Sequence, residues 1–417
     1  MTDLESLPVK WKDIEKACEN LKDNAVITPC RRFTGLSDQC QCDLYLKLEC
    51  FQRCKSFKFR GAFNKITMVP KGSTIICCSA GNHSQGCALS STINGCKSII
   101  YMPENAPVAK VQATEHYGGH VIQKGATFDD AKAEMQKDLD AHPEYIYIPP
   151  FDDVDIIAGQ GTIGKEIVDQ LPDVNYVVVP VGGGGLAAGV AVAIKNMKPN
   201  TKIIAVQMAS CPYAYLLYNK HRKHEKKVIV HSVKTPLADG IAVKEPGKIN
   251  LEILYKIVDD FVIVTEDEVA VSVAMLAERG KLITEGAGAT SFAAVYFKKF
   301  EYFSTDKVCC IISGGNIPLQ MLARCIERAL FIRKSRVVLD VILPYGSSHM
   351  SQMLKVFVDN HVNVVSCRTV SHVDTVANQD HYNVVVDLHD ANELKNIMNE
   401  FNEHNWTYSV ESTTPVE

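Results

Sequence analysis

Residues 47–62 read KLECFQRCKSFKFRGA, and they contain the most informative side chain of the sequence. Lys58 lies between Phe57 and Phe59, so part of its surroundings is apolar. Removal from water disfavours the ammonium ion and leaves the amine free to act as a nucleophile or a base. A lysine that forms a Schiff base needs this property. The competing interpretation is a lysine whose aliphatic stem is covered while its ammonium stays in solvent.

A second informative segment is SAGNHSQG at residues 79–86. It follows an apolar run at residues 73–78 and precedes a helical pattern of small residues, so it predicts a strand, a turn and the start of a helix. Free backbone N–H groups at such a helix start attract anions. Asn82 and His83 can add side-chain donors, and the segment therefore predicts a binding site for a small anion.

The third segment is PVGGGGLAAG at residues 180–189, which follows the strand-like residues 176–179. Four successive glycines between a strand and a helix allow the backbone to come close to a phosphate group. A run of glycines is also typical of flexible linkers. Hydrophobic segments on both sides of this run favour the phosphate site.

A lysine, an anion loop and a phosphate loop together suggest pyridoxal phosphate, an electron sink that enzymes hold through an imine and a phosphate. At this point the sequence resembles the fold-type II pyridoxal-phosphate enzymes, specifically the group of threonine dehydratases (threonine ammonia-lyases) and serine racemases. The resemblance rests on seven motifs in the order of that family: SFKFRGA (56–62), SAGNHSQG (79–86), FDDVDIIAGQGTIG (151–164), VGGGGLAAG (181–189), LADGIAV (237–243), TEGAGA (284–289) and ISGGN (312–316).

Strand-like and helical segments alternate up to about residue 330, which indicates an α/β fold with mainly parallel sheets. The resemblance implies that residues 1–330 form a two-lobed catalytic domain, with a smaller lobe at about residues 60–155 and the cofactor in the cleft between the lobes. The strands that we expect include residues 73–78, 98–102, 120–122, 176–181, 202–206, 261–264 and 308–312.

The resemblance also implies roles for individual residues. Lys58 would bind the cofactor and remove the α-proton of the substrate, with Phe57 beside it, and Asn82 would bond the ring hydroxyl. Ser79 and His83 would be catalytic. The substrate carboxylate would lie on Ser79, Gly81, Asn82 and His83. The phosphate would lie on Gly182, Gly183, Gly184 and Gly185, the pyridine nitrogen on Ser313, and Glu285 and Gly240 would line the cleft.

Ala80 separates two reactions of this group. Racemases of the family carry a serine in that position to handle the proton on the opposite face, and alanine cannot transfer a proton. We therefore expect elimination: L-threonine would give 2-oxobutanoate and ammonia, and L-serine would give pyruvate. A serine racemase remains the close alternative. The sequence does not separate a role in isoleucine biosynthesis from threonine breakdown.

Lys55 departs from the family, which usually has glycine immediately before the serine of the SFK motif. A second ammonium could lower the pKa of the neighbouring amine, or the change could face solvent without consequence. Register with Ser56 and Arg60 favours Lys58 as the cofactor lysine. A non-catalytic protein that binds a cofactor or an amino acid is the alternative of another class.

The character of the chain changes after about residue 330. A basic segment at residues 331–336 predicts a linker, and the elements expected at residues 337–417 follow the order β-α-β-β-α-β, typical of an α+β ferredoxin-like unit. In this position the unit resembles an ACT regulatory domain. The resemblance implies an allosteric small-molecule effector and a homo-oligomer. A purely structural or dimerising unit is the alternative.

Composition excludes several classes of function. The formal net charge of −4 provides no basic field for nucleic acid. The first residues contain no apolar segment of a secretory signal, and no apolar run is long enough for a membrane span. Fifteen cysteines in a chain of 417 residues, without paired CxxC spacing, suggest reduced thiols in the cytoplasm.

Two further patterns predict what the chain lacks. Residues 159–164 satisfy GxGxxG, but an acidic segment precedes them, so a dinucleotide site is disfavoured and a helix start near the cleft is expected. Racemases of this group hold a divalent cation through two carboxylates. Gln207 and Tyr213 occupy those positions here, so we predict no metal at that site.

Overall fold

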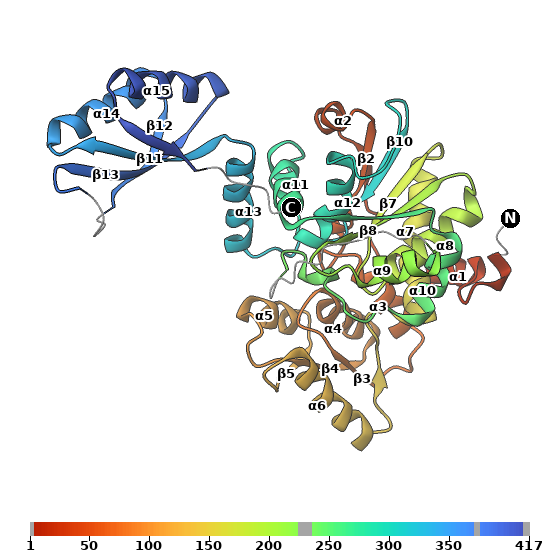
Figure 1. Cartoon of the computed structure of the whole chain (residues 1–417). Helices are drawn as coiled ribbons and strands as arrows, with labels where there is room; N and C mark the ends of the chain where they lie inside the picture. Colours follow the sequence, from red (N-terminus) through yellow and green to blue (C-terminus); the bar gives the residue numbers. More distant parts are fainter. Residues whose placement is uncertain (1–3, 224–235, 371–375, 412–417) are drawn as a thin grey trace. The chain divides into compact units, whose positions relative to one another are not determined.

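The computed structural model describes residues 4–223, 236–370 and 376–411, and the chain forms two compact units, Met1–Leu322 and Ala323–Glu417 (Figure 1). The division falls inside helix α13 (Leu319–Ile332). The boundary at residue 330 and the linker at residues 331–336 stay predictions. The last residues of the expected regulatory domain, 412–417, lie outside the described residues.

The smaller sheet of the first unit is entirely parallel, with the order β5-β4-β3-β6. Its strand β3 is buried on both faces: Ile75 and Cys77 pack toward helix α4, and Ile76 and Cys78 pack toward helix α6. Two covered faces explain the continuous apolar run in the sequence. The strands are β3 (Thr74–Cys78), β4 (Lys97–Met102), β5 (His120–Gln123) and β6 (Ile146–Tyr147), with helices α3 (Lys58–Ile66), α4 (Asn82–Asn94), α5 (Val108–His116) and α6 (Phe128–Ala141).

The larger sheet has six strands in the order β1-β2-β10-β7-β8-β9, and all neighbouring pairs except β1 with β2 are parallel. This confirms the predicted two-lobed α/β fold. The strands are β1 (Cys30–Arg32), β2 (Asp43–Lys47), β7 (Tyr176–Pro180), β8 (Lys202–Met208), β9 (Asp260–Val264) and β10 (Lys307–Ile311). The helices around them are α1 (Trp11–Leu21), α2 (Thr34–Cys40), α7 (Val154–Gln170), α8 (Gly185–Met197), α9 (Tyr213–His221), α10 (Lys248–Ile257), α11 (Glu266–Glu278) and α12 (Gly286–Tyr296), with short 3-10 turns η1 (Leu4–Ser6), η2 (Glu49–Phe51) and η3 (Asp239–Ile241).

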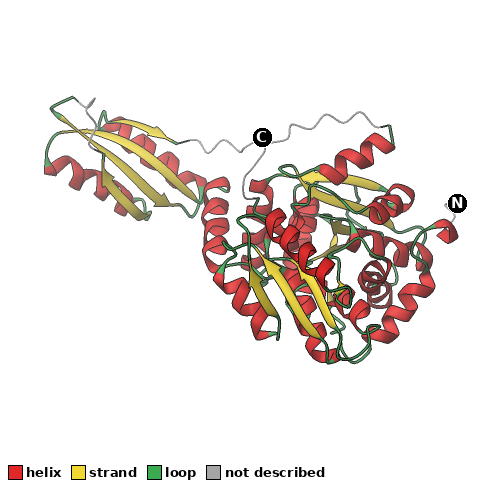
Figure 2. Ribbon diagram, turned by 90° about the horizontal axis from the view of Figure 1, so that it is seen from below, coloured by secondary structure: helices red, strands yellow, loops and turns green. Residues whose placement is uncertain are grey.

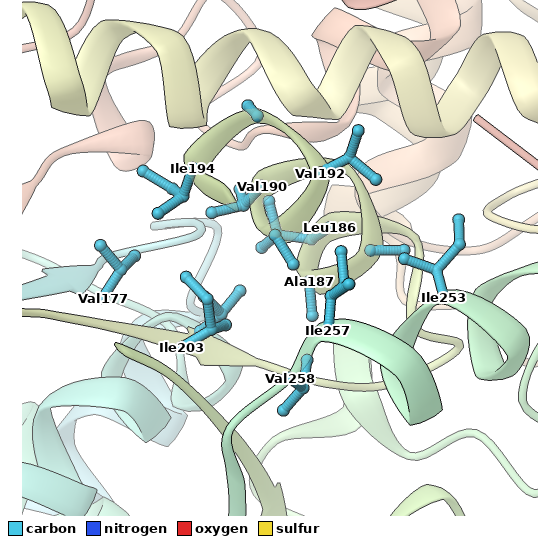
Figure 3. Close-up of a cluster of buried hydrophobic side chains, with 14 of the residues drawn as sticks. Val177, Leu186, Ala187, Val190, Val192, Ile194, Ile203, Ile253, Ile257 and Val258 are labelled. Carbon is cyan, nitrogen blue, oxygen red and sulfur yellow. The ribbon is translucent and has the colours of Figure 1, made fainter. Parts of the chain in front are cut away.

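Helix α8 lies at the centre of the larger lobe, and side chains such as Leu186 and Val190 join β7, β8 and α10 in one apolar cluster (Figure 3). Residues 185–194 of this helix are all buried, which explains why they carry no polar side chain on any side of the helix. No helix in the described ranges combines the length and the apolar character that a membrane crossing requires.

The GxGxxG segment is not a helix start, and that prediction was wrong. Residues 159–164 lie in the middle of α7, where their small size permits close helix packing. A Cβ atom on Gly159 would lie 2.7 Å from the backbone oxygen of Arg60, and one on Gly161 would lie 3.0 Å from the oxygen of Gly189. The glycines therefore serve contacts of α7 with α3 and α8, not a nucleotide.

The second unit has the predicted order β-α-β-β-α-β and an antiparallel sheet with strand order β12-β13-β11-β14, which is a ferredoxin-like fold (Figure 2). Buried and half-buried residues alternate along β11, so one face of the sheet carries the core. The elements are β11 (Arg336–Pro344), α14 (Ser347–Asp359), β12 (Asn363–Thr369), β13 (Gln379–Asp387), α15 (Ala391–Glu403) and β14 (Thr407–Val410).

Candidate active site

The predicted site residues gather at the carboxyl ends of parallel strands. Strand β3 leads through Ser79 into α4, β7 leads through the four glycines into α8, and β10 leads into Ser313. Ligands of open α/β sheets bind at this edge. The first unit therefore brings three segments that are distant in sequence to one region.

Lys58 is the first residue of α3, and its Nζ donates a hydrogen bond of 2.6 Å to the carbonyl oxygen of Pro150. The same Nζ lies 5.3 Å from the centroid of the Phe57 ring and 5.9 Å from that of Phe151. Burial lowers the pKa of Lys58 to about 8. An amine with this pKa has an appreciable neutral fraction near physiological pH, as a nucleophilic lysine requires.

Lys55 is exposed and has φ +58°, a left-handed conformation that glycine adopts most easily. Its carbonyl oxygen accepts a hydrogen bond of 2.9 Å from the N–H of Gly315. The backbone conformation gives a physical reason for glycine in this position. The lowered pKa of Lys58 comes mainly from burial.

Lys55→Gly is expected to raise the free energy of unfolding by about 0.5–1 kcal/mol. Glycine adopts the left-handed conformation without the steric strain that lysine has there, and this gain exceeds the extra conformational entropy that glycine loses on folding. Urea denaturation measures this change. Lys55→Ala is the matched control, since it removes the amine but keeps the strained backbone. A fall in stability for Lys55→Gly would contradict the backbone argument.

The anion loop presents backbone groups at the start of α4. The N–H of Gly81 donates to Ser79 Oγ at 3.2 Å, and Asn82 begins the helix. His83 turns inward: its side chain is buried, and its Nε2 lies 3.0 Å from the carbonyl oxygen of Ile148. Burial, with Lys58 nearby, lowers the pKa of His83 to about 3, so the ring is neutral. Its contribution to an anion site would come from its backbone N–H.

The four glycines fit a phosphate. Among the described residues, no hydrogen bond from the N–H groups of Gly182, Gly183, Gly184 or Gly185 is found, so these donors remain available at the start of α8. Gly184 has φ +99°, and a Cβ atom on Gly183 would overlap the ring of Phe151. The same Phe151 ring lies 5.9 Å from Lys58 Nζ, so it is close to both the glycine loop and the lysine.

Ser313 lies beside the lysine segment. Phe57 N–H donates to the carbonyl oxygen of Ser313 at 3.0 Å, and Ser56 forms a β-bridge with Gly314. The Ser313 hydroxyl is buried and donates to the carbonyl oxygen of Ala287 at 3.3 Å. A hydroxyl at a pyridine nitrogen would leave the ring unprotonated more often than a carboxylate would.

A chain of three polar side chains joins the anion loop to the Ser313 loop. Asn82 donates from Nδ2 to Glu285 Oε1 at 2.6 Å, and Asn316 donates from Nδ2 to Asn82 Oδ1 at 2.7 Å. Burial, with Asp239 nearby, raises the pKa of Glu285 to about 7. We did not predict a role for Asn316, although it closes the ISGGN motif that marks this loop.

A cluster of paired, largely buried charges anchors helix α3, which begins at Lys58. Arg60 is 1% exposed and makes hydrogen bonds of 2.8 Å to both carboxylate oxygens of Glu49 and of 2.6 and 2.9 Å to those of Glu166. Lys47 Nζ lies 2.5 Å from Glu166. Two cations and two anions are thus paired, and they join β2, η2, α3 and α7.

Gln207 and Tyr213, which occupy the positions of the two carboxylates in racemases of this group, differ in their surroundings. Gln207 is buried and accepts a hydrogen bond of 3.0 Å from the N–H of Tyr215, while Tyr213 is exposed. Ligand atoms of Cys77, His83 and Cys87 lie within 4.8 Å of one another, but these thiols belong to the apolar core of the smaller lobe. Thiols are poor ligands for a hard divalent cation.

A buried lysine of lowered pKa, glycine N–H groups at a helix start and a two-lobed parallel fold are features that a pyridoxal-phosphate enzyme requires. The family model described as "Pyridoxal-phosphate dependent enzyme" matches residues 21–314, and the chain belongs to this family. Its cofactor is pyridoxal 5'-phosphate, which the residues described above fit.

Relatives and solved structures show which members of this family the chain is similar to. The chain is 41% identical over 322 residues to the catabolic L-threonine dehydratase of Escherichia coli K12, covering 76% of this chain and 96% of that protein. It is 39% identical to an L-threonine ammonia-lyase of Thermotoga maritima, covering 86% of this chain and 88% of that protein. Threonine deaminase isoform 2 of Solanum lycopersicum has a TM-score of 0.69 at 34% identity, covering 77% and 90% of the two chains, and maize serine racemase has 0.70 at 27%, covering 78% and 99%.

Proposed function

We propose that this enzyme deaminates L-threonine to 2-oxobutanoate and ammonia by β-elimination of water, and L-serine to pyruvate in the same way. The observation that carries the proposal is Lys58, a buried amine of lowered pKa that lies 5.9 Å from the ring of Phe151, which in turn contacts the glycine loop. The relatives named for threonine support the choice of substrate. The test is the release of both products from purified protein.

The residues divide the work as follows. The helix start at Gly81 and Asn82 holds the substrate carboxylate, and the four glycines hold the cofactor phosphate. Bound pyridoxal phosphate supplies electron withdrawal from the α-carbon. Lys58 would hold the cofactor, and its Nζ would serve as the base that accepts the α-proton of the substrate. Elimination removes one water, and hydrolysis of the released enamine consumes one, which frees ammonia.

Ala80 favours elimination over racemisation. Racemisation needs a proton donor on the face opposite Lys58, and alanine offers none. We expect no D-serine above background from the natural enzyme. Ala80→Ser should raise D-serine formation from L-serine to at least about tenfold above that background, because a positioned general acid or base contributes about 10²–10⁴-fold. Chiral chromatography measures this. D-serine formed by the unaltered enzyme as fast as pyruvate would support the racemase alternative.

We further propose that residues 337–417 regulate the catalytic domain of residues 1–330 by binding a small effector in a homo-oligomer. The ferredoxin-like fold of the second unit supports this proposal. Threonine saturation curves of the full chain with and without amino acids or nucleotides test it. Unchanged curves with every effector would contradict it.

The reduced thiols inferred from the sequence support a cytoplasmic location.

A further inference from the structure

The orientation of the Asn82 amide follows from its neighbours. Asn316 Nδ2 lies 2.9 Å from the carbonyl oxygen of Cys54, which can only accept, and 2.7 Å from Asn82. The NH₂ group of Asn316 therefore faces both partners, so Asn82 presents its oxygen to Asn316. Its own NH₂ group must then face Glu285, whose Oε1 lies 2.6 Å away.

We propose that Glu285 is a positioning residue that, together with Asn316, fixes the Asn82 amide so that its second N–H points to the ring oxygen of the cofactor. The inference rests on the proposed function, in which Asn82 bonds that oxygen. Hydrogen bonds to Glu285 and Asn316 prevent rotation of the Asn82 amide. A rotated amide would turn its own oxygen toward the ring oxygen, and the two oxygens would repel each other.

Glu285 is itself held in place. It is 9% exposed, its N–H donates to the carbonyl oxygen of Gly314 at 3.2 Å, and its carbonyl oxygen accepts from the N–H of Ala289 at 3.0 Å. A Cβ atom on Gly314 would overlap Glu285 Oε1, so the glycine turn after β10 leaves just enough room for this carboxyl group.

The protonation state of Glu285 matters because the ring oxygen carries negative charge. With a pKa of about 7, Glu285 is mostly a neutral acid below that pH and places no second negative charge near the ring. Above pH 7 it ionises and repels the ring oxygen. The titratable groups that face Glu285 are Asp239 from η3, Lys110 from α5, Lys58 from α3 and Cys50 from η2.

The test compares the complete enzyme with Glu285→Gln, Glu285→Ala and the control Glu252→Gln, an exposed surface change on α10. The measured quantities are the dissociation constant of pyridoxal phosphate and the visible band of the lysine-bound cofactor at several pH values. The affinity of the natural enzyme should fall about tenfold as pH rises through about 7. Glu285→Gln, which accepts the same hydrogen bond without charge, should remove this pH dependence. Glu285→Ala should also remove the pH dependence, and below pH 7 it should weaken binding about tenfold relative to the natural enzyme, because Asn82 can then rotate.

Two results would overturn the inference while leaving the proposed function intact. One is a Glu285→Gln enzyme that deaminates threonine and keeps the pH dependence of the natural enzyme. The other is a Glu285→Ala enzyme with unchanged cofactor affinity and spectrum. Absence of any lysine-bound band in the natural enzyme would instead overturn the proposed function, and the inference with it.

Discussion

Lys58→Ala is expected to lower the rate of threonine deamination by about 10³-fold or more and to remove the visible band of the lysine-bound cofactor. The variant retains the anion loop and the glycine loop, so it should still bind pyridoxal phosphate without a covalent bond. It lacks both the amine that holds the cofactor and the base that removes the α-proton. The release of 2-oxobutanoate and the absorbance spectrum of the resting enzyme measure the two losses separately.

Lys55→Ala is the matched control for Lys58→Ala, because it removes an amine only three positions away. Lys55 is exposed, whereas the Nζ atom of Lys58 lies at Pro150 between two aromatic rings. Lys55→Ala should therefore keep both the rate and the band. If Lys55→Ala lost the band and Lys58→Ala kept it, the assignment of the cofactor lysine would be reversed.

Arg60→Met is expected to lower the free energy of unfolding by about 3–5 kcal/mol, since it leaves the buried carboxylate of Glu49 without the cation bonded to it. Burial opposes ionisation of Glu49, but Arg60, together with Lys47 and the Thr28 hydroxyl, lowers the pKa of Glu49. Without Arg60, only Lys47 and Thr28 would offset this burial. Urea denaturation of the variant and the natural protein, both free of cofactor, measures the difference.

The control for Arg60→Met is Arg32→Met. Arg32 also pairs with a carboxylate, that of Asp43, but both side chains are substantially exposed. Exposed pairs contribute at most about 1 kcal/mol. The prediction therefore requires a large loss for Arg60→Met and a small one for Arg32→Met. Losses of similar size for both variants would show that the cluster of Arg60, Glu49 and Glu166 does not anchor α3.

The parallel strands were predictable because a strand that is buried on both faces has a continuous run of apolar residues. Strand β3 and strand β7 are examples. We did not predict β1 or β2. Strand β1 is three residues long and contains two arginines, and β2 mixes charged and apolar residues, so neither has a clear pattern. Strand β2 joins the sheet by pairing with β10, and β1 joins it by pairing with β2.

The motifs indicated which segments to expect at the site, and the structure brings the lysine, anion and Ser313 loops together; the roles of their residues stay predictions. The sequence could not predict which way side chains point. The inward turn of His83 depends on Ile148, and the grip on Asn82 depends on Asn316 and Glu285. These partners lie far apart in the chain. The prediction for the glycines of the GxGxxG segment was wrong for the same reason, because the residues of α3 and α8 that they contact are known only from the fold.

The most direct test of the central claim is to incubate the purified enzyme, loaded with pyridoxal phosphate, with L-threonine and to quantify 2-oxobutanoate and ammonia. The geometry of Lys58 predicts that both products form in equal amounts and that threonine disappears at the same rate. A lysine-bound cofactor with neither product would contradict the assignment of this site to threonine deamination.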